Sequence, residues 1–192
     1  MKPLLLFCFI ITFAERSSAQ ITRGSWLVGG TGFFKSSKNN SNTFPNYSTT
    51  DLQFYPDFGY FIADKFATGL KLGFGTQRYK SPDDSFIGKH TNHSFGPWLR
   101  YYVLPVKGSV NLLVDGSYQY GIVKQNRSKA GINTLSFAAG PALFFNPNVA
   151  MELLVGYATT NYVTEDVGHN QLNVGLGLQV HLQKRNNSLQ VL

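Results

Sequence analysis

Cysteine is almost absent from this 192-residue sequence, because Cys8 is the only one. Disulfide frameworks and structural zinc sites of the common kinds need several cysteines. Cys8 also lies inside an apolar N-terminal run that we expect to be removed from the mature chain. The mature protein is therefore expected to have no disulfide, no thiol nucleophile and no cysteine metal site.

Charged residues are scarce too, at 14% of the composition, although the formal net charge is +7. A nucleic-acid-binding protein gathers its basic residues on one face or helix, whereas here they are scattered through candidate loops, so we expect no nucleic-acid partner. Beyond the N-terminus no stretch approaches the roughly 18 apolar residues of a transmembrane helix. The 15% aromatic content and 19 glycines, with little helical periodicity, favour an all-β protein.

The N-terminus has the three parts of a secretory signal peptide. Lys2 precedes an apolar run over residues 4–11, and Ser17, Ser18 and Ala19 are the small residues before a cleavage site. The run is too short to cross a bilayer as a helix. We predict a signal peptide over residues 1–19, or 1–20, and keep a membrane anchor or a core helix as the alternative.

The last regular segment, residues 171–182, has a strict period of two. Its aliphatic positions alternate with Asn173, Gly175, Gly177, Gln179 and His181. This pattern predicts a β-strand with one apolar face and one small or polar face. At about 3.3 Å per residue and a tilt of about 40°, ten such residues rise about 25 Å, which is the height of the apolar band of an outer-membrane barrel.

The same reading along the chain predicts eight strands. They cover residues 24–34, 51–62, 66–77, 93–103, 109–122, 134–145, 149–160 and 171–182. The connections alternate between tight turns and longer polar loops, which is the pattern of outer-membrane barrels. The sequence thus predicts an eight-stranded antiparallel up-and-down transmembrane β-barrel over residues 20–182, with extracellular loops, periplasmic termini and a short periplasmic tail over 183–192.

An internal repeat places an aromatic residue four positions after a proline. Pro56, Pro97 and Pro141 lie 41 and 44 residues apart, one hairpin and one loop each time. Repetition at a fixed period indicates stacked similar units. Because proline inside a paired strand removes a ladder hydrogen bond, we expect a bulge or a missing bond at each proline.

Three segments carry a resemblance to a known family. They are Gly96-Pro97-Trp98-Leu99-Arg100-Tyr101-Tyr102, Gly140-Pro141 with residues 144–153, and residues 58–70. They resemble the outer membrane protein beta-barrel domain family of porin-like proteins, small barrels of Gram-negative bacteria similar to the OmpX and OmpA membrane domains. The resemblance implies the barrel fold, a monomer, and assembly by the outer-membrane insertion machinery. Such barrels commonly end on an aromatic residue, whereas here Leu182 is followed by ten residues without one.

Aromatic residues of the predicted outward face gather near the strand ends. We predict two belts at the membrane–water interfaces, with aliphatic residues between them. One belt consists of Trp26, Tyr60, Phe66, Tyr101 and Phe145, and the other includes Phe54, Phe74, Phe95, Tyr118 and Tyr157. The alternative is that these aromatics form the core of a soluble sandwich.

The predicted inward face carries five charged residues: Asp57, Lys71, Arg100, Asp115 and Glu152. Buried charges are costly unless they are paired, so we expect a lumen charge network and a plugged lumen. Hairpin register places Asp57 opposite Lys71, and Arg100 close to Asp115 across the next turn. The alternative is that each charge is hydrated independently in a wet lumen.

Catalytic and cofactor signals are weak. His90 and His93 lie three apart near Asp83 and Asp84, but no further ligand motif accompanies them, and solvated loop histidines are the simpler interpretation. His169 and His181 are isolated. We therefore assign no catalytic, cofactor or metal residue, and expect no cofactor.

Three functions are compatible with the sequence. The first is a non-enzymatic outer-membrane barrel with a structural or interaction role in the envelope, in contact with outer-membrane lipid and lipopolysaccharide. The second is a lipid-modifying enzyme on the same scaffold. The third is a soluble lipocalin-like binder of a small lipophile, whose apolar face would point inward.

Overall fold

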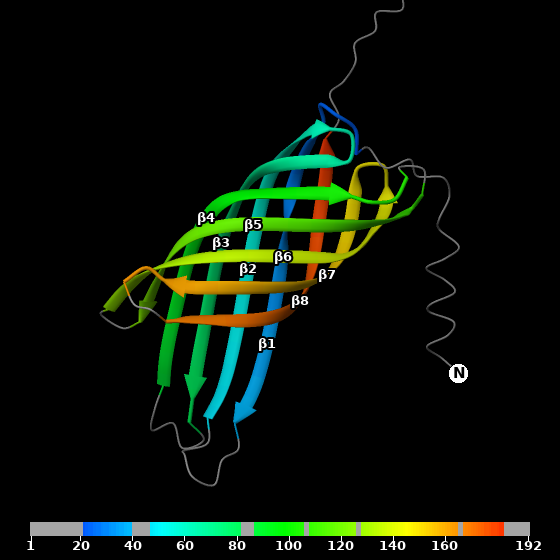
Figure 1. Ribbon diagram of the computed structural model, residues 1–192. Helices are drawn as coiled ribbons and strands as arrows, with labels where there is room; N and C mark the ends of the chain where they lie inside the picture. The colour runs from blue at the N-terminus through cyan, green and yellow to red at the C-terminus, as the bar shows by residue number, and fades with distance from the viewer. Residues whose placement is uncertain are drawn as a thin grey trace, which may run out of the picture.

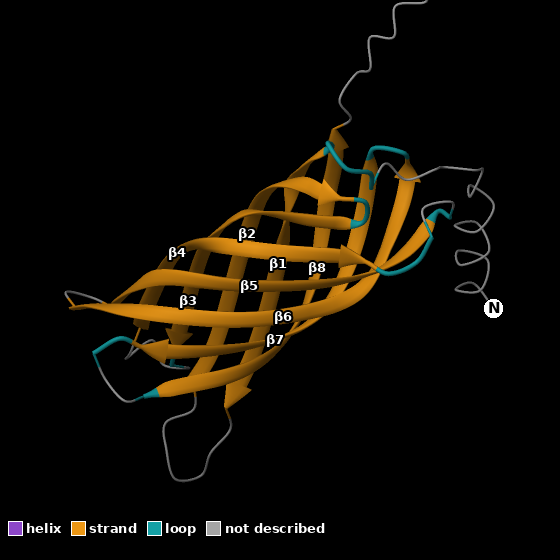
Figure 2. Cartoon of the chain, turned by 45° about the horizontal axis from the view of Figure 1, so that its top comes forward, coloured by secondary structure: helices purple, strands orange, loops and turns teal. Residues whose placement is uncertain are grey.

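The computed structural model describes residues 21–39, 47–81, 87–105, 108–125, 128–164 and 167–182. The predicted signal peptide (1–19) and tail (183–192) lie outside the described residues. Strands account for almost all of the described chain (Figure 2). They are β1 Trp26–Asn39, β2 Tyr47–Ala63, β3 Phe66–Lys80, β4 Ile87–Tyr102, β5 Val110–Gln125, β6 Ser128–Asn146, β7 Val149–Tyr162 and β8 Gly168–Leu182. Within this part of the chain, no helix has the length and apolarity needed to span a bilayer.

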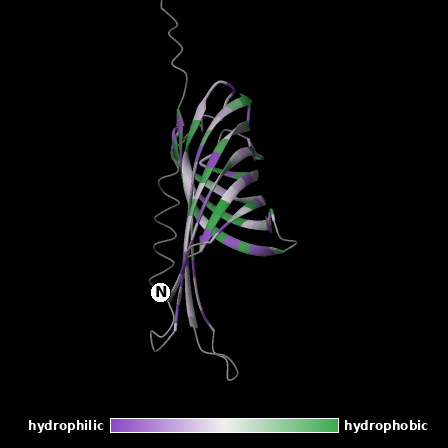
Figure 3. Cartoon of the chain, turned by 90° about the vertical axis from the view of Figure 1, so that its left-hand side faces the viewer, coloured by the Kyte–Doolittle hydropathy of each residue, from purple (hydrophilic) through white to green (hydrophobic). Residues whose placement is uncertain are grey.

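The eight strands form one closed barrel in which each strand pairs with its neighbours in the sequence and β8 returns to β1 (Figure 1). Every pairing is antiparallel. This confirms the predicted eight-stranded up-and-down barrel. Buried and exposed residues alternate along β7, and Figure 3 shows apolar and polar bands on several strands, so the wall has two different faces.

The two ends of the barrel differ. We call the end with the connections 64–65, 103–109 and 147–148 the short-turn rim, and the end with the connections 40–46, 81–86, 126–127 and 163–167 the long-loop rim. The described chain also begins and ends at the short-turn rim, since Trp26 pairs with Leu182 there. An even number of strands requires this arrangement.

The predicted long loops were too long, because the strands extend further toward the long-loop rim. β1 reaches Asn39 instead of residue 34, and β4 begins at Ile87 instead of residue 93. The third loop, predicted over 123–133, is mostly a hairpin that stays paired up to Gln125 and Ser128. Polar residues satisfy their backbone groups by pairing just as apolar residues do. Hydropathy indicated where the apolar face ends but not where the pairing ends.

All three repeated prolines coincide with breaks in the strand ladder. The pairing skips residues 55–56 between β2 and β3, residues 96–97 between β4 and β5, and residues 140–141 between β6 and β7. The register is the same on both sides of each break, so neither strand has an extra residue and there is no bulge. The skipped residues simply lack a ladder partner on that side. The expectation of missing bonds at Pro56, Pro97 and Pro141 is confirmed.

Close approach of neighbouring strands explains the glycine before Pro141. A Cβ on Gly140 would collide with the backbone carbonyl oxygen of Leu153 in β7. We expect Gly140→Ala to lower the free energy of unfolding by about 1–3 kcal/mol, measured by urea titration of the refolded barrel. Gly116→Ala is the matched control, because its Cβ would lie 3.5 Å from the nearest atom of the Phe137 ring. Equal stability of the two variants would contradict this steric account.

The barrel closes through a short ladder. β1 and β8 pair from Trp26–Leu182 to Phe33–Gly175, whereas β1 and β2 stay paired as far as Asn39 and Tyr47. In Figure 1 the long-loop ends of β1 to β4 point down and those of β5 to β8 point left. The long-loop ends of β1 and β8 therefore run in different directions beyond their last pair, Phe33 and Gly175.

An apolar cluster fills the lumen next to the short-turn rim. It contains inward side chains from seven strands, including Leu27, Phe61, Leu113, Phe144 and Ala150, each at most 3% exposed. The sequence had indicated mainly small, polar and charged residues on the inward face, with Trp98 as an exception, so this apolar floor was not predicted. It seals the end of the lumen next to the chain termini.

Candidate functional site

The five predicted lumen charges lie together directly above the apolar floor. We call the cluster of Asp57, Lys71, Arg100, Asp115 and Glu152 the plug. These residues come from β2, β3, β4, β5 and β7, and all are at most 9% exposed. Inward positions on different strands meet here because an eight-stranded barrel is just wide enough for side chains to fill it.

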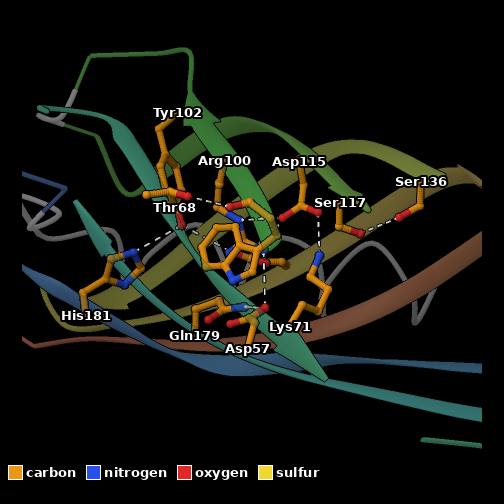
Figure 4. A network of polar contacts seen from close by, with 12 residues as sticks. Asp57, Thr68, Lys71, Arg100, Tyr102, Asp115, Ser117, Ser136, Gln179 and His181 are labelled. Atoms are coloured by element: carbon orange, nitrogen blue, oxygen red, sulfur yellow. Dashed lines mark hydrogen bonds and ion pairs between the residues drawn. The ribbon is translucent and has the colours of Figure 1, made fainter. Parts of the chain in front are cut away.

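Arg100 is the centre of the plug (Figure 4). Its Nη1 lies 2.9 Å from Oε1 of Glu152, and its Nη2 lies 3.1 Å from Oδ2 of Asp115. The same Nη2 is 3.7 Å from Oδ2 of Asp57. One planar guanidinium therefore joins carboxylates from three strands, which is the kind of buried pairing for which arginine is suited.

The second cation, Lys71, pairs across the lumen. Asp57 and Lys71 are opposite each other in register, as predicted, and so are Arg100 and Asp115. The Lys71 Nζ, however, donates to Oδ1 of Asp115 at 2.6 Å. The prediction that Asp57 faces Lys71 was therefore right about the backbone and wrong about the partner, since the long lysine side chain reaches another strand.

Four further inward residues complete the plug, and the sequence did not indicate their roles. Gln179 Nε2 donates to Oδ2 of Asp57 at 3.0 Å, and the Tyr102 hydroxyl lies 3.4 Å from Oε1 of Glu152. The Arg100 guanidinium carbon lies 5.1 Å from the Trp98 ring centroid. His181, which we took as isolated, lies 3.2 Å from the Tyr102 hydroxyl through Nε2. Strand parity already placed Gln179, His181 and Trp98 on the inward face, but it could not show which groups meet.

A polar cavity of about 190 Å³ lies on the long-loop side of the plug. We call it the cup. Lys71 and Asp115 belong to its lining and form its floor, and residues of all eight strands form its walls. Most of these residues point inward, but the outward Phe137 and Tyr157 also border the cavity. Hydroxyl pairs link neighbouring strands there, at 2.7 Å between Ser117 and Ser136 and at 2.9 Å between Thr134 and Thr160. Along the barrel axis, the lumen is thus a polar cavity toward the long-loop rim, a charged cluster in the middle and an apolar cluster toward the short-turn rim.

The outward face is apolar across the whole barrel. Leu70, Leu99, Val114, Leu153 and Leu176 are between 46% and 61% exposed. No charged residue occupies this face of the described strands between the levels of the two predicted belts. A wall with leucines outside and a charged plug inside is the reverse of a water-soluble barrel.

The predicted belt residues occupy two levels of this face. At the short-turn rim Trp26 is opposite Tyr60 and Phe66 is opposite Tyr101, and the Trp26 and Tyr60 ring centroids are 4.9 Å apart. Phe145 is exposed at the same rim. Toward the long-loop rim the register pairs Phe54 with Phe74, Phe95 with Tyr120 and Phe137 with Tyr157, and Tyr118 is exposed nearby.

The two candidate metal-binding histidines point to opposite sides of the wall. Both lie within β4 and not in a loop, and a spacing of three on a strand reverses the face. The outward His93 lies 5.8 Å from the Phe74 ring, and the inward His90 lies 5.2 Å from the Tyr79 ring, centroid to centroid. Asp83 and Asp84 lie outside the described residues. No group of three or more potential metal ligands occurs within the described part of the chain.

No family model and no curated protein matches the chain. Among solved structures it is similar to Neisserial surface protein A, at 16% sequence identity and a TM-score of 0.55, over 82% of this chain and 96% of that chain. It is also similar to the N-terminal β-barrel domain of Pseudomonas aeruginosa OprF, at 13% identity and a TM-score of 0.43, over 83% of this chain and 98% of that chain. The likeness to the Neisserial protein is one of fold, and it agrees with the predicted family resemblance. The chain has the fold of the small eight-stranded barrels of outer membranes.

Proposed function

We propose that this protein is an integral outer-membrane β-barrel with a non-enzymatic role, structural or interactive, in the envelope. The observation that carries the proposal is the distribution of side chains. The outer surface exposes leucine, valine and aromatic residues, while Asp57, Arg100 and Glu152 are buried inside. In lipid this arrangement hides the charges and leaves the apolar face in an apolar solvent.

The dimensions of the apolar face fit a bilayer. On β8 it extends from Leu172, which is opposite Tyr157, to Leu182, which is opposite Trp26. Ten residues of tilted strand rise about 25 Å, which matches the apolar band of outer-membrane barrels. We place the long-loop rim outside the cell and both chain ends in the periplasm, with assembly by the insertion machinery as a monomer.

Between the aromatic level near the long-loop rim and that rim, which we call the upper aromatic level and the upper end of the barrel, the outward face is basic. This suits contact with lipopolysaccharide phosphates. Arg78 is opposite Lys89 on β3 and β4, and Lys124 is opposite Lys129 on β5 and β6. Like charges placed directly opposite each other destabilise a sheet, and a bound anionic group offsets that repulsion. All four residues are exposed.

The soluble lipocalin-like alternative requires apolar residues inside. Leu172, Leu176 and Leu178 are instead between 55% and 71% exposed. The lipid-modifying alternative requires a histidine beside a nucleophile. His93 lies outside and His181 is buried in the plug, whereas His90 and His169 line the cup. The placements of His93 and His181 favour the non-enzymatic role.

Membrane fractionation tests the proposal. We expect the protein in the outer-membrane fraction, soluble only in detergent, with gel migration that changes on heating and with lipopolysaccharide bound after purification. The variant carrying His90→Ala and His93→Ala is expected to fractionate identically and to leave the lipid composition unchanged. Recovery in the soluble fraction would refute the membrane assignment, and a lipid change in that variant would favour the enzyme.

A further inference from the structure

The backbone pairing of β1 with β8 ends short of the long-loop rim. Beyond Phe33 and Gly175, residues 34–39 of β1 remain with β2, and residues 168–174 of β8 remain with β7. We call the space between these two strand segments the notch. In Figure 1 the long-loop ends of β1 and β8 run in different directions at this place. The joint opposite the notch differs, because β4 and β5 stay paired up to His90 and Gln125.

The cup and the notch lie next to each other. Thr31 and Phe33 of β1 and Gln171 and Asn173 of β8 all line the cup, and they flank the last pairs of the closing ladder. The Phe33 ring occupies the space over Gly175, where any Cβ would collide with it. The cup is therefore bounded on this side by the ends of the two strands that separate.

Exposed apolar residues frame the notch on the outer surface. Phe34 is 67% exposed, Leu172 is 71% exposed and Val174 is 60% exposed. Leu172 is opposite Tyr157 of the upper aromatic level. With the barrel placed as proposed, the notch thus lies where the apolar band meets the head-group layer.

The lining of the cup is rich in hydroxyls and amides, and besides the Lys71–Asp115 pair it carries the carboxylate of Asp51 and the imidazoles of His90 and His169. Among the described residues that line the cup, the one lysine is Lys71, and the carboxylate of Asp115 neutralises its charge. Asp51 accepts a hydrogen bond from Gln53 at 2.9 Å, and Gln53 in turn accepts one from the Tyr55 hydroxyl at 2.9 Å. Most of the other lining groups are amides and hydroxyls, which both donate and accept.

The size of the cup limits the ligand. A volume of about 190 Å³ is below the roughly 300 Å³ at which pockets for drug-sized ligands begin. The cup therefore has room for one small head group and not for an oligosaccharide.

We propose that the cup and the notch together bind a single-chain amphiphile with an uncharged, hydroxyl-rich head group. The head group lies in the cup among Gln53, Tyr55 and Thr134. The chain leaves through the notch and lies against Phe34, Leu172 and Val174. This site rests on the proposed membrane location, because only there does the notch face lipid.

Nuclear magnetic resonance of the full barrel in phospholipid nanodiscs tests the site, with octyl β-glucoside as the probe. We expect saturable shifts of the backbone amides of Gln53, Tyr55 and Asn173. Free glucose and octyl sulfate are the comparison arms, since one lacks the chain and the other replaces the neutral head with an anion. Each is expected to require at least about tenfold more probe for the same shift.

Ser136→Phe is the variant that fills the cup, since Ser136 lines it from β6. It is expected to raise the half-saturating concentration of octyl β-glucoside at least about tenfold. Ala139→Phe is the matched control, because it adds the same ring to the exposed outward face of the same strand. If Ser136→Phe fails to fold, the paired change Thr134→Val and Thr160→Val removes two lining hydroxyls at constant volume and is expected to weaken the shifts.

Three outcomes would overturn the proposal: shifts that persist in the cup variants, glucose acting at the same concentration as octyl β-glucoside, or octyl sulfate binding equally well. Failure of the membrane assignment would look different, because the barrel would then not enter nanodiscs at all. A barrel that inserts and shows no saturable shift refutes the amphiphile site alone.

Discussion

Leu176→Arg is expected to lower the free energy of unfolding from lipid vesicles by about 2–4 kcal/mol. Leu176 is 61% exposed on β8, midway between Leu172 at the upper aromatic level and Leu182 at the lower one. An arginine there would have to place its guanidinium near the middle of the bilayer, where water cannot solvate it. Urea titration of the vesicle-folded barrel gives the difference directly.

Leu172→Arg is the matched control for depth. It lies on the same strand and face and is 71% exposed, but its head group would reach the interface, so the expected cost falls to about 0–1 kcal/mol. In a water-soluble barrel both substitutions would replace exposed leucines and stay within about 0.5 kcal/mol of the parent. Two equal, small effects would therefore contradict the membrane placement.

Arg100→Met is expected to destabilise the barrel by about 3–5 kcal/mol. The plug holds three carboxylates against two cations, and Arg100 contacts all three of them within 3.7 Å. Methionine fills similar space without charge, so Asp57 and Glu152 would remain buried without a cation. Tryptophan fluorescence reports the transition, because the Trp98 ring lies against the guanidinium and the second tryptophan, Trp26, lies on the outward face.

Two further variants separate lost pairing from lost packing. Arg78→Met removes an exposed arginine at the long-loop rim and is expected to change stability by less than about 0.5 kcal/mol. Adding Glu152→Gln to Arg100→Met removes one unpaired carboxylate and is expected to recover part of the loss. If Arg100→Met is as stable as Arg78→Met, the plug does not hold the barrel together.

The barrel and much of its register could be predicted from the sequence because a period of two assigns each residue to a face. A tight turn then fixes the register, and this placed Lys71 opposite Asp57 and Asp115 opposite Arg100. The strand ends at the long-loop rim could not be predicted. Beyond the apolar band both faces of the hairpins are polar, so the pattern fades while the pairing continues.

The site was predictable as a set of residues but not as a set of contacts. Parity placed Asp57, Lys71, Arg100, Asp115 and Glu152 inside, and the structure brings them together. Which carboxylate pairs with which cation depends on how far each side chain reaches across the lumen. The spacing of residues in the sequence does not contain that information. The notch could not be predicted either, because it follows from the divergence of β1 and β8 and not from any residue pattern.

The ladder that joins Trp26 to Leu182 connects the two extremes of the described chain, whereas every other ladder joins consecutive strands. Loop-closure entropy grows with the length of chain between the partners, so this ladder is the most costly to nucleate. The seven hairpin ladders can form from local encounters, so we expect the pairing of the first strand with the last to be the slow step of folding. Until that event the nascent sheet has two unsatisfied edges, and a protein that shields them during biogenesis would bind β1 and β8 in preference to the strands between.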